Sequence, residues 1–414
     1  MNADMESDGE FSESSDNQVI EYRDREEVND AEDENMEEDE PEEMVVSNEC
    51  IFDLTLPAMH SYLGQNLEEL RGRTLLDDGI YMNLPLLKKQ SVILFPGQTL
   101  PMIGYNPLIK EMLMTCIRNN RTLGVVCLGN DKIVSVGTTA EIYACTFEDR
   151  VHGFRFKAIG RQRFKILQVI IQGYKVSANV KVLPEITLGP PFGDERLSSL
   201  DNLRIHPTTE EDFKKQERVE NLDAIVTPWP AWVYRQYDPL RLSLKIRQHL
   251  QFIENRGSSI PKDPTDLSFW VAQNLFLDEY ERIVLLNYDC AISRLQKEIK
   301  YLEDDKIFVC CECNSYIGKQ SHMFPMSKEG PQGTYCNRAG IIHDTVTLYH
   351  AQGLQLNHGA PSTEYTWFPG YAWTIATCKC CGTHMGWKFT AVESHLKPKS
   401  FWGLTRGSLK SKKK

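Results

Sequence analysis

Two short stretches decide the fold of the C-terminal part of the chain, VCCECNSY at residues 309–316 and CKCCGTH at residues 378–384. Each contains a Cys-x-x-Cys pair, and the two pairs are Cys310 with Cys313 and Cys378 with Cys381. Two thiolates with this spacing can reach one ion from a tight turn, and a second such turn completes the tetrahedral sulfur shell that structural zinc favours. We therefore expect one structural Zn2+ ion in a closed shell, with no open position for catalysis.

The cysteines beside these pairs leave the ligand assignment open. Cys311 and Cys380 adjoin predicted ligands, so spacing alone does not decide between Cys310 and Cys311 as the first one. Between Cys313 and Cys378 lie 64 residues, far more than the ~15–20 of a simple zinc ribbon. The insert must itself be folded, and its residues 345–349 alternate as a strand does.

Three tryptophans lie in and just after this insert, and a phenylalanine follows them. They are Trp367, Trp373 and Trp387, with Phe389 two residues after the last. In a strand, Trp387 and Phe389 would share one face. Large aromatic residues at this density are more often core than pocket. If they form a cage instead, its indole faces could hold a flat neutral ring, or a methylated ammonium group through cation–π attraction.

The charge of the chain is concentrated near its start. Residues 1–43 carry 20 acidic side chains and two arginines, which gives this segment a net charge of −18. The whole chain has a net charge of −12, so residues 44–414 together have a net charge of +6. We expect residues 1–48 to be a disordered acidic tail, because so few apolar side chains cannot offset the entropy of ordering. Residues 410–414 form a short basic tail. A nearly neutral body argues against a nucleic-acid partner, which needs clustered basic residues.

The cysteines and the absence of long apolar runs indicate the compartment. No signal peptide opens the chain, and no run of ~18 apolar residues could span a membrane. Seven of the 12 cysteines lie between Cys310 and Cys381 with metal-like pairing. A reducing compartment, cytoplasm or nucleus, is therefore expected. The remaining thiols are predicted to be ordinary scattered residues, namely Cys50, Cys116, Cys127, Cys145 and Cys290.

The rest of the chain predicts a multidomain protein, mainly β with a helical segment. Stretches rich in Val, Ile, Phe and Tyr predict strands at residues 84–87, 92–95, 124–128, 134–146, 154–159, 164–171 and 175–183. A helix is expected at 107–119. Residues 187–208 are loop-like, and helical spacing then continues to Asp304, where it predicts a helical bundle.

The β-rich part resembles the substrate-binding N-terminal domain of Lon proteases. The resemblance rests on LPLLKKQSVILFPGQTLPM at residues 84–102 and VGTTAEIY at residues 136–143. It implies a Lon N-terminal-like domain at 80–305 that includes the helical segment. No G-x-x-x-x-G-K-[ST] phosphate loop is present, because the Gly318–Lys319 pair is followed by Gln320. We therefore do not expect this chain to carry out ATP-dependent proteolysis.

The C-terminal stretch resembles the thalidomide-binding domain of the cereblon family. The residues are STEYTWFPGYAWTIATCKCCGTHMGWKFT at 362–390 and FWGLTR at 401–406. The resemblance implies a zinc-binding, cyclic-imide-binding domain at 306–409. It also implies a non-catalytic substrate receptor of a cullin-RING E3 ubiquitin ligase. The helical segment, about 187–305, would attach the receptor to the damaged-DNA-binding protein adaptor.

Transferred residue by residue, the family pocket has three walls, a back and a rim. The walls are Trp367, Trp373 and Trp387, the back is Phe389, and the rim is Glu364, Tyr365 and Asn337. A glutarimide or succinimide ring is flat and uncharged, and its N–H and carbonyl groups need partners once buried. The resemblance implies that the carbonyl of Tyr365 and the main-chain N–H of Trp367 supply them. Family members carry His where this chain has Tyr365, and Ile375 is expected near the rim.

The resemblance implies a natural ligand, and the sequence also leaves two alternative functions and the role of two tryptophans open. The natural ligands it implies are protein C-termini that end in a cyclised Gln or Asn, and thalidomide-like drugs would share their imide ring. One enzyme alternative is a zinc-containing methionine sulfoxide reductase, with Cys336 as the nucleophile. A methyl-lysine reader is the other alternative, and Glu364 would supply its negative charge. Trp229 and Trp232 could anchor the adaptor or could be core.

Overall fold

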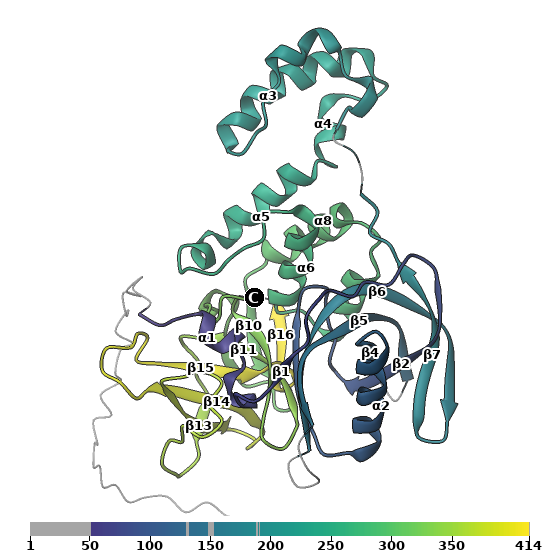
Figure 1. Ribbon diagram of the computed structural model, residues 1–414. Coiled ribbons are helices and arrows are strands. Elements are labelled where there is room, and N and C mark those ends of the chain that lie inside the picture. The colour runs from purple at the N-terminus through teal and green to yellow at the C-terminus, as the bar shows by residue number, and fades with distance from the viewer. Residues whose placement is uncertain (1–50, 130–131, 148–152, 188, 190, 414) are drawn as a thin grey trace, which may run out of the picture. The chain divides into compact units, whose positions relative to one another are not determined.

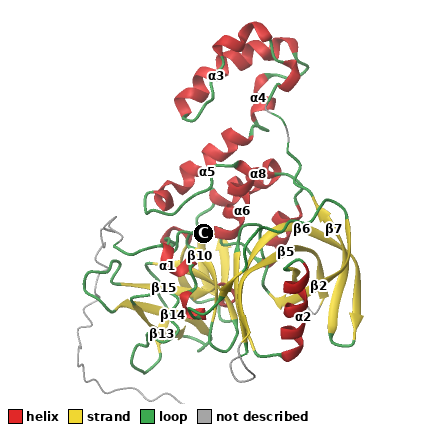
Figure 2. Ribbon diagram, in the orientation of Figure 1, coloured by secondary structure: helices red, strands yellow, loops and turns green. Residues whose placement is uncertain are grey.

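The structure is a computed structural model that describes residues 51–129, 132–147, 153–187, 189 and 191–413, all within one unit, Asn48–Lys414. It is mainly β with a helical segment, which confirms the predicted fold class (Figure 1, Figure 2). The predicted acidic tail and Cys50 lie outside the described residues. Over the described part of the chain, no helix is long and apolar enough to cross a membrane.

The N-terminal sheet has seven strands, and five of them close into a ring. The strands are β1 (Glu68–Glu69), β2 (Ile80–Gln90), β3 (Thr99–Gly104), β4 (Thr122–Gly129), β5 (Lys132–Phe147), β6 (Phe154–Gln172) and β7 (Lys175–Leu183). Their order is β1-β5-β4-β2-β7-β6-β3, and β5 also pairs with β6. The ring therefore runs through β5, β4, β2, β7 and β6, with β2 and β4 parallel and the other pairs antiparallel.

Helix α2 (Pro107–Asn119) covers this sheet and has the bounds that the sequence predicts (Figure 1). It begins where it does because the side chain of Asn106 accepts a hydrogen bond from the N–H of Leu108, and proline occupies the first helical position. Its buried residues, Leu113 and Cys116, pack into the core of the sheet. Its apolar face thus contributes to the same core as the strands.

One strand prediction in this sheet is wrong, and two other predicted strands are continuous with each other. The predicted strand at 92–95 is a buried loop, because the N–H of Phe95 donates to the side chain of Gln98 (3.0 Å) rather than to a neighbouring strand. A short apolar run does not by itself distinguish a strand from a buried loop. The predicted strands at 154–159 and 164–171 form one long strand, β6. Gly160 does not break it, since its N–H donates to the carbonyl of Gln98.

The helical segment follows the sheet. Its α-helices are α3 (Glu210–Asp223), α4 (Ala231–Arg235), α5 (Pro239–Glu254), α6 (Pro264–Asn274), α7 (Glu279–Asn287) and α8 (Ala291–Leu302). Figure 1 shows α5, α6 and α8 side by side, in agreement with their contacts. Their apolar stripes form one core that includes Ile246, Leu267 and Leu295. Asp238, Asp263 and Asp278 cap the helices that follow them, which is why each helix begins there.

Shorter elements precede or connect these parts of the chain. They are α1 (Thr55–Ala58) and the 3₁₀ turns η1 (Ser61–Leu63), η2 (Gly193–Glu195), η3 (Ser198–Leu203), η4 (Ala224–Val226), η5 (Gln320–His322) and η6 (Arg406–Ser408).

The C-terminal module contains two antiparallel sheets. Its strands are β8 (Lys306–Cys310), β9 (Tyr316–Lys319), β10 (Gln332–Cys336), β11 (Ile342–Leu348), β12 (Leu354–Leu356), β13 (Tyr371–Cys378), β14 (His384–Ala391), β15 (Ser400–Thr405) and β16 (Leu409–Lys413). The larger sheet has the order β10-β11-β15-β14-β13-β12, and the smaller one β16-β8-β9. Residues 345–348 of the strand predicted at 345–349 belong to β11, and residue 349 lies just after it.

The predicted basic tail at 410–414 needs correction. Its residues up to Lys413 belong to β16, which pairs with β8 from Leu409 opposite Cys310 to Lys413 opposite Lys306. Leu409 is buried at the start of this strand, whereas Lys410, Lys412 and Lys413 are exposed although their main chain is paired. Charge at the end of the chain suggested a tail, but the main chain completes a sheet. The module therefore extends past residue 409.

Candidate functional site

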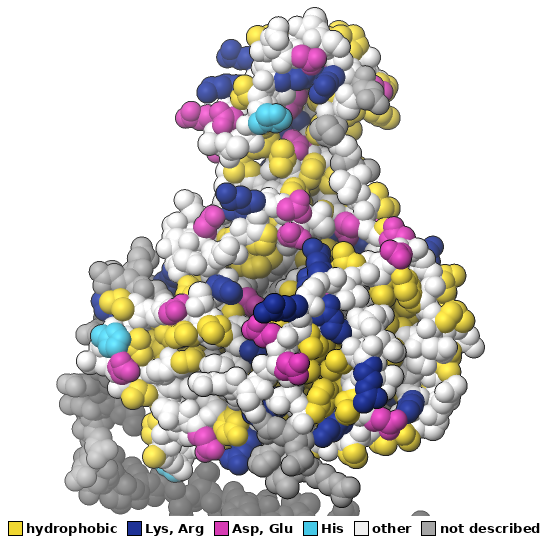
Figure 3. Space-filling view, viewed as in Figure 1, with side chains coloured by type: hydrophobic (Ala, Val, Ile, Leu, Met, Phe, Trp, Pro, Cys, Tyr) yellow, Lys and Arg dark blue, Asp and Glu magenta, His cyan; other side chains and the backbone are white. Residues whose placement is uncertain are grey.

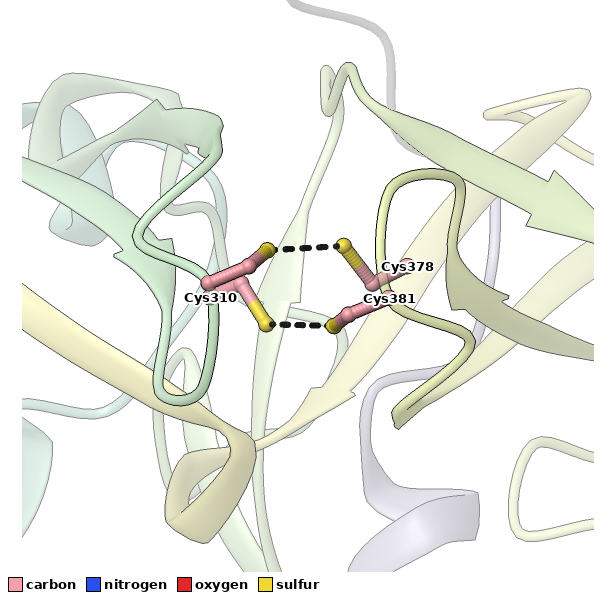
Figure 4. Close-up of side chains that lie close together, drawn as sticks. Cys310, Cys378 and Cys381 are labelled. Carbon is pink, nitrogen blue, oxygen red and sulfur yellow. Dashed lines mark hydrogen bonds between the residues drawn. The ribbon is translucent and has the colours of Figure 1, made fainter. Parts of the chain in front are cut away.

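Four cysteine sulfur atoms converge between the two sheets of the C-terminal module. Cys310 ends β8 and Cys313 lies in the following turn, while Cys378 ends β13 and Cys381 lies in the turn before β14. All four sulfur atoms lie within 4.8 Å of one another. The Cys310 and Cys381 sulfurs are 3.6 Å apart, and those of Cys313 and Cys378 are 3.5 Å apart. In Figure 4 the labelled Cys310 lies across the gap between the two turns from the labelled Cys378 and Cys381.

This arrangement fits a zinc ion. The sulfur separations exceed the ~2.05 Å of a disulfide. They are close to the ~3.8 Å edge of a tetrahedron with Zn–S bonds of ~2.3 Å. Hydrogen bonds from the side chain and main chain of Ser315 lower the pKa of Cys313 to about 6, which favours the thiolate that zinc binds. Four thiolates fill a tetrahedral shell, so the donor set is that of a structural site.

The neighbouring cysteines do not join this cluster. The thiol of Cys311 is 3.5 Å from a carboxylate oxygen of Glu312, and Cys380 is exposed. Neither belongs to the group of four convergent sulfurs. The geometry therefore favours Cys310 over Cys311 as the first ligand, a choice that spacing had left open.

The aromatic cage is built on the strands of the same hairpin, β13–β14. Trp373 pairs with Phe389, and Ile375 pairs with Trp387. Side chains opposite each other in an antiparallel pair lie on the same face, as do residues two apart in one strand. All four side chains therefore point from one face of the hairpin. The neighbouring pair Lys388 and Trp402 lies on the other face.

Trp367 completes the cage from the loop that precedes β13. Its ring centroid is 4.6 Å from that of Trp387, at 74°, and 5.0 Å from the parallel ring of Tyr335. Its indole N–H donates to the carbonyl of Cys336 (3.2 Å). Trp367 and Phe389 are 5% and 1% exposed, so these two also belong to the core, whereas Trp373 and Trp387 are half-buried.

All seven side chains predicted for the ligand pocket line one cavity of about 570 Å3. They are Asn337, Glu364, Tyr365, Trp367, Trp373, Trp387 and Phe389. Ile375, predicted near the rim, lines it as well. Cavities that hold drug-sized ligands span ~300–1,000 Å3, so this one is large enough for a small organic ring.

Two main-chain groups at the cage are free to bind a ligand. The carbonyl of Glu364 accepts from the indole N–H of Trp373 (2.8 Å), which fixes both the loop and the wall. In contrast, among the described residues neither the carbonyl of Tyr365 nor the main-chain N–H of Trp367 has a hydrogen-bond partner. Tyr365 has a φ of +54°, a conformation that side chains other than glycine adopt at a cost.

Two histidines that the sequence did not indicate also line the cavity. The ring of His343 contacts Trp387 edge to face with centroids 5.0 Å apart, and the ring of His384 does so at 4.9 Å. Burial and the nearby His384 lower the pKa of His343 to about 4, and burial also lowers the pKa of His384. Both imidazoles are therefore neutral at pH 7 and add no charge to the cavity.

A bulge explains why His384 escaped prediction. Strict alternation from Trp387 would send His384 to the opposite face. The pairing instead runs from Ala376 opposite Gly386 to Thr377 opposite His384, so Met385 is an extra residue. Gly386 has a φ of +140°, and a side chain there would meet the carbonyl of Gly403. The extra residue returns His384 to the cage face.

Cys336 lies behind the cage rather than in it. It is fully buried, and burial raises the pKa of its thiol to about 11. A reactive cysteine is partly exposed and has a lowered pKa. The position of Cys336 therefore suits a core residue and not a nucleophile.

Known sequence families match both parts of the chain. The family described as "ATP-dependent protease La (LON) substrate-binding domain" matches residues 83–304, more than half of the chain. The family described as "Yippee zinc-binding/DNA-binding /Mis18, centromere assembly" matches residues 306–413. The second match supports zinc as the metal of the four-cysteine cluster.

Curated relatives match nearly the whole chain. Protein cereblon of Gallus gallus is 39% identical over 86% of this chain and 84% of its own. Protein cereblon of Xenopus tropicalis is 40% identical over 86% of this chain and 84% of its own. Protein cereblon of Danio rerio is 37% identical over 95% of this chain and 94% of its own. At this identity and coverage, the chain belongs to the cereblon family.

Proposed function

We propose that this chain is the substrate receptor of a cullin-RING E3 ubiquitin ligase, and that its cage recognises cyclic imides. The ligands are glutarimide or succinimide rings at protein C-termini, and thalidomide-like molecules share that ring. The receptor works in the cytoplasm and nucleus, and catalysis belongs to other subunits. One structural zinc ion stabilises the module that carries the cage.

The observation that carries this proposal is the pair of free main-chain groups beside three indole walls. An imide presents a donor N–H between two acceptor carbonyls on a flat ring. The carbonyl of Tyr365 can accept from the imide N–H, and the N–H of Trp367 can donate to an imide carbonyl. Aromatic walls remove water from the ring, which makes a buried but unpaired polar group costly. The cage therefore suits a small flat ring that carries both a hydrogen-bond donor and a hydrogen-bond acceptor.

The charges at the cavity favour a neutral ligand over a methylated lysine. Among the side chains that line it, Glu364 is the one carboxylate, and it forms an ion pair with Arg338 (2.9 Å). The two histidines are neutral at pH 7 and offer a cation no charge of opposite sign. A cage for methylated ammonium gains from unpaired negative charge, and here the nearest carboxylate is already neutralised.

The reductase alternative loses its nucleophile. Attack on a sulfoxide needs an accessible thiolate, but Cys336 is buried with a raised pKa. The four-cysteine cluster offers no substitute, since its thiolates are all assigned to the metal. No cysteine lines the described cavity.

An exposed apolar patch in the helical segment supports adaptor binding there. Trp229 and Trp232 are 60% and 59% exposed, and the nearby Ile225 is 76% exposed. A core role for these two tryptophans is therefore wrong. Side chains of this size exposed together mark interaction sites, and tryptophan is prominent among binding hot spots. We assign this patch to the damaged-DNA-binding protein adaptor. Elsewhere, on the described face in Figure 3, positive and negative side chains are intermixed.

The imide proposal is tested on the zinc-loaded full chain by titrating glutarimide and following tryptophan fluorescence. Wild type should show saturable quenching, and Trp373→Ala should weaken binding at least tenfold, about 1.4 kcal/mol. Trp402→Phe is the matched control, because Trp402 lies on the other face of the same sheet. Equal affinities of wild type and Trp373→Ala would rule out the cage as the binding site.

The adaptor proposal is tested by co-precipitation with the purified adaptor. Trp232→Ala should reduce the adaptor bound at least tenfold while leaving glutarimide affinity and far-UV circular dichroism unchanged, because the side chain is exposed. Tyr280→Ala, which removes an exposed aromatic side chain from α7, serves as the control. Undiminished adaptor binding by Trp232→Ala would move the docking surface elsewhere.

A further inference from the structure

Arg338 is the one cationic side chain at the described cavity, and the pocket predicted from the sequence did not include it. It lies in the turn between β10 and β11, and this turn is closed by hydrogen bonds from Gly340 N–H to the carbonyl of Asn337 and from Ile341 N–H to its side chain. The turn thus fixes the point from which the arginine extends. The guanidinium reaches the loop before Trp367 on the other side of the cavity.

Two contacts hold the guanidinium there. Its Nη1 donates to Oε1 of Glu364 at 2.9 Å, and its central carbon lies 5.3 Å from the ring centroid of Tyr365. The side chains of Arg338 and Glu364 are 69% and 66% exposed, and an ion pair this exposed contributes little to stability. Stacking uses the face of a guanidinium and leaves its edge available. The two contacts therefore hold the Arg338 guanidinium in place but add little to the stability of the fold. A side chain held in this way is better explained by a role in ligand binding.

The guanidinium of Arg338 has further N–H groups with which it can bind a ligand. It carries five N–H groups, of which the contact with Glu364 uses one. The remaining groups stand at the edge of a cavity of about 570 Å3, which is larger than one five- or six-membered ring fills. When the imide ring of a ligand occupies the cage, the atoms attached to that ring therefore lie beside Arg338.

The chemistry of a C-terminal imide defines those atoms. The ring forms from the last residue of a chain, so its α-nitrogen is acylated by the residue before it. One carbonyl oxygen therefore lies just outside every such ring, and a free glutarimide lacks it. An acceptor that loses water on binding needs a donor, and a charged donor gives the stronger bond.

We infer that Arg338 is a specificity-determining residue that donates to this acyl carbonyl, so that the cage prefers imides joined to a chain over the free ring. This inference rests on the proposed function, because it takes the imide ring to occupy the cage. The Tyr365 ring provides the surface on which the guanidinium rests. The substrate class is then an acylated aminoglutarimide or aminosuccinimide.

The test compares two ligands on the zinc-loaded full chain, glutarimide and 3-acetamidoglutarimide. Wild type should bind the acetamido ligand more tightly. Arg338→Ala should weaken the acetamido ligand about fivefold or more, the size of one exposed hydrogen bond to a charged group, and should leave glutarimide within about twofold. Arg338→Lys keeps the charge but loses the planar fork, and should recover only part of the preference.

Glu364→Gln separates this role from loop closure. If Arg338 only ties the two loops together, Glu364→Gln weakens the same tie by removing the carboxylate charge and should shift the affinity of both ligands in the same direction as Arg338→Ala. If Arg338 donates to the ligand, Glu364→Gln should keep the preference for the acetamido compound. Equal losses for both ligands in Arg338→Ala, or no loss for either, would overturn the inference while glutarimide binding by wild type upholds the cage. Failure of wild type to bind glutarimide overturns both.

Discussion

The β13–β14 hairpin carries half of the sulfur cluster in its turn and most of the aromatic cage on its strands. The cluster would join two turns through bonds to a metal ion, whereas the cage side chains are held by packing and by hydrogen bonds such as that of Trp373 to Glu364. The first site stabilises the fold, and the second presents half-buried surface to a ligand. One hairpin therefore separates stability from recognition along its length, and substitutions at its two ends should have different effects.

The largest effect is expected at the turn. Cys378→Ser removes one of four zinc ligands, and the binding energy of a structural zinc ion, ~10–16 kcal/mol in small domains, matches or exceeds the stability of a typical domain. We expect loss of bound zinc, loss of near-UV circular dichroism from the module, and loss of imide binding as a consequence. Zinc content and near-UV spectra measure this.

Cys380→Ser is the matched control for that substitution. It changes an exposed thiol in the same turn that is not part of the cluster. Zinc content, spectra and imide binding should stay at wild-type values. A zinc loss in Cys380→Ser equal to that in Cys378→Ser would show that the ligand assignment is wrong.

A smaller effect is expected when the cage is acidified. The pKa of His343 lies near 4 in the folded chain, because burial disfavours its charged form, and near 6.5 when unfolded. The unfolded state therefore binds more protons between these values, and stability that is complete above pH 6.5 falls as the pH drops towards 4. Urea unfolding of the module at pH 7.5 and pH 5 measures the change.

His343→Gln removes this titration and should lose less stability between the two pH values than wild type. Zinc must be counted at each pH, so that release of the metal is not mistaken for protonation of the cage. An identical pH dependence in both proteins would show that His343 does not titrate with a lowered pKa. The cluster and the other histidines whose pKa burial lowers, such as His384, would then account for the acid sensitivity.

The smallest effect is expected at the rim. Ile375→Val removes one methyl group from a half-buried side chain that lines the cavity beside Trp387. Glutarimide affinity should stay within about twofold, because the ring contacts the indole walls. Assembly of a ternary complex with a ligand-dependent partner should change, since Ile375 contributes to the surface that the partner meets. Equal changes in both measurements would contradict this assignment.

The two ends of the hairpin also differ in what the sequence revealed. Cys-x-x-Cys spacing is a local signal, because each turn alone positions two sulfurs, and it led to Cys310, Cys313, Cys378 and Cys381. Trp367, Trp373 and Trp387 are separated along the chain, so their density alone left core and cage open, and resemblance to a family favoured the cage. The structure shows that they line one cavity, although Trp367 also serves the core.

The features that escaped prediction depend on contacts distant in sequence. His384 reaches the cage through a bulge that alternation cannot anticipate, and Arg338 reaches it across a loop. The apolar run at 92–95 is buried without strand pairing because Gln98 takes the N–H of Phe95. Residues 410–413 looked like a tail because lysine indicates exposure, and exposure is compatible with an edge strand.

That edge strand has a practical consequence for handling the protein. β16 pairs along the whole of β8, the strand that ends at Cys310, and the N–H of Cys311 donates to the carbonyl of Ser408. A premature stop codon near residue 408 would remove few residues but would strip the support from the first metal ligand. An affinity tag is for the same reason better fused to the N-terminal end, where it leaves this pairing intact.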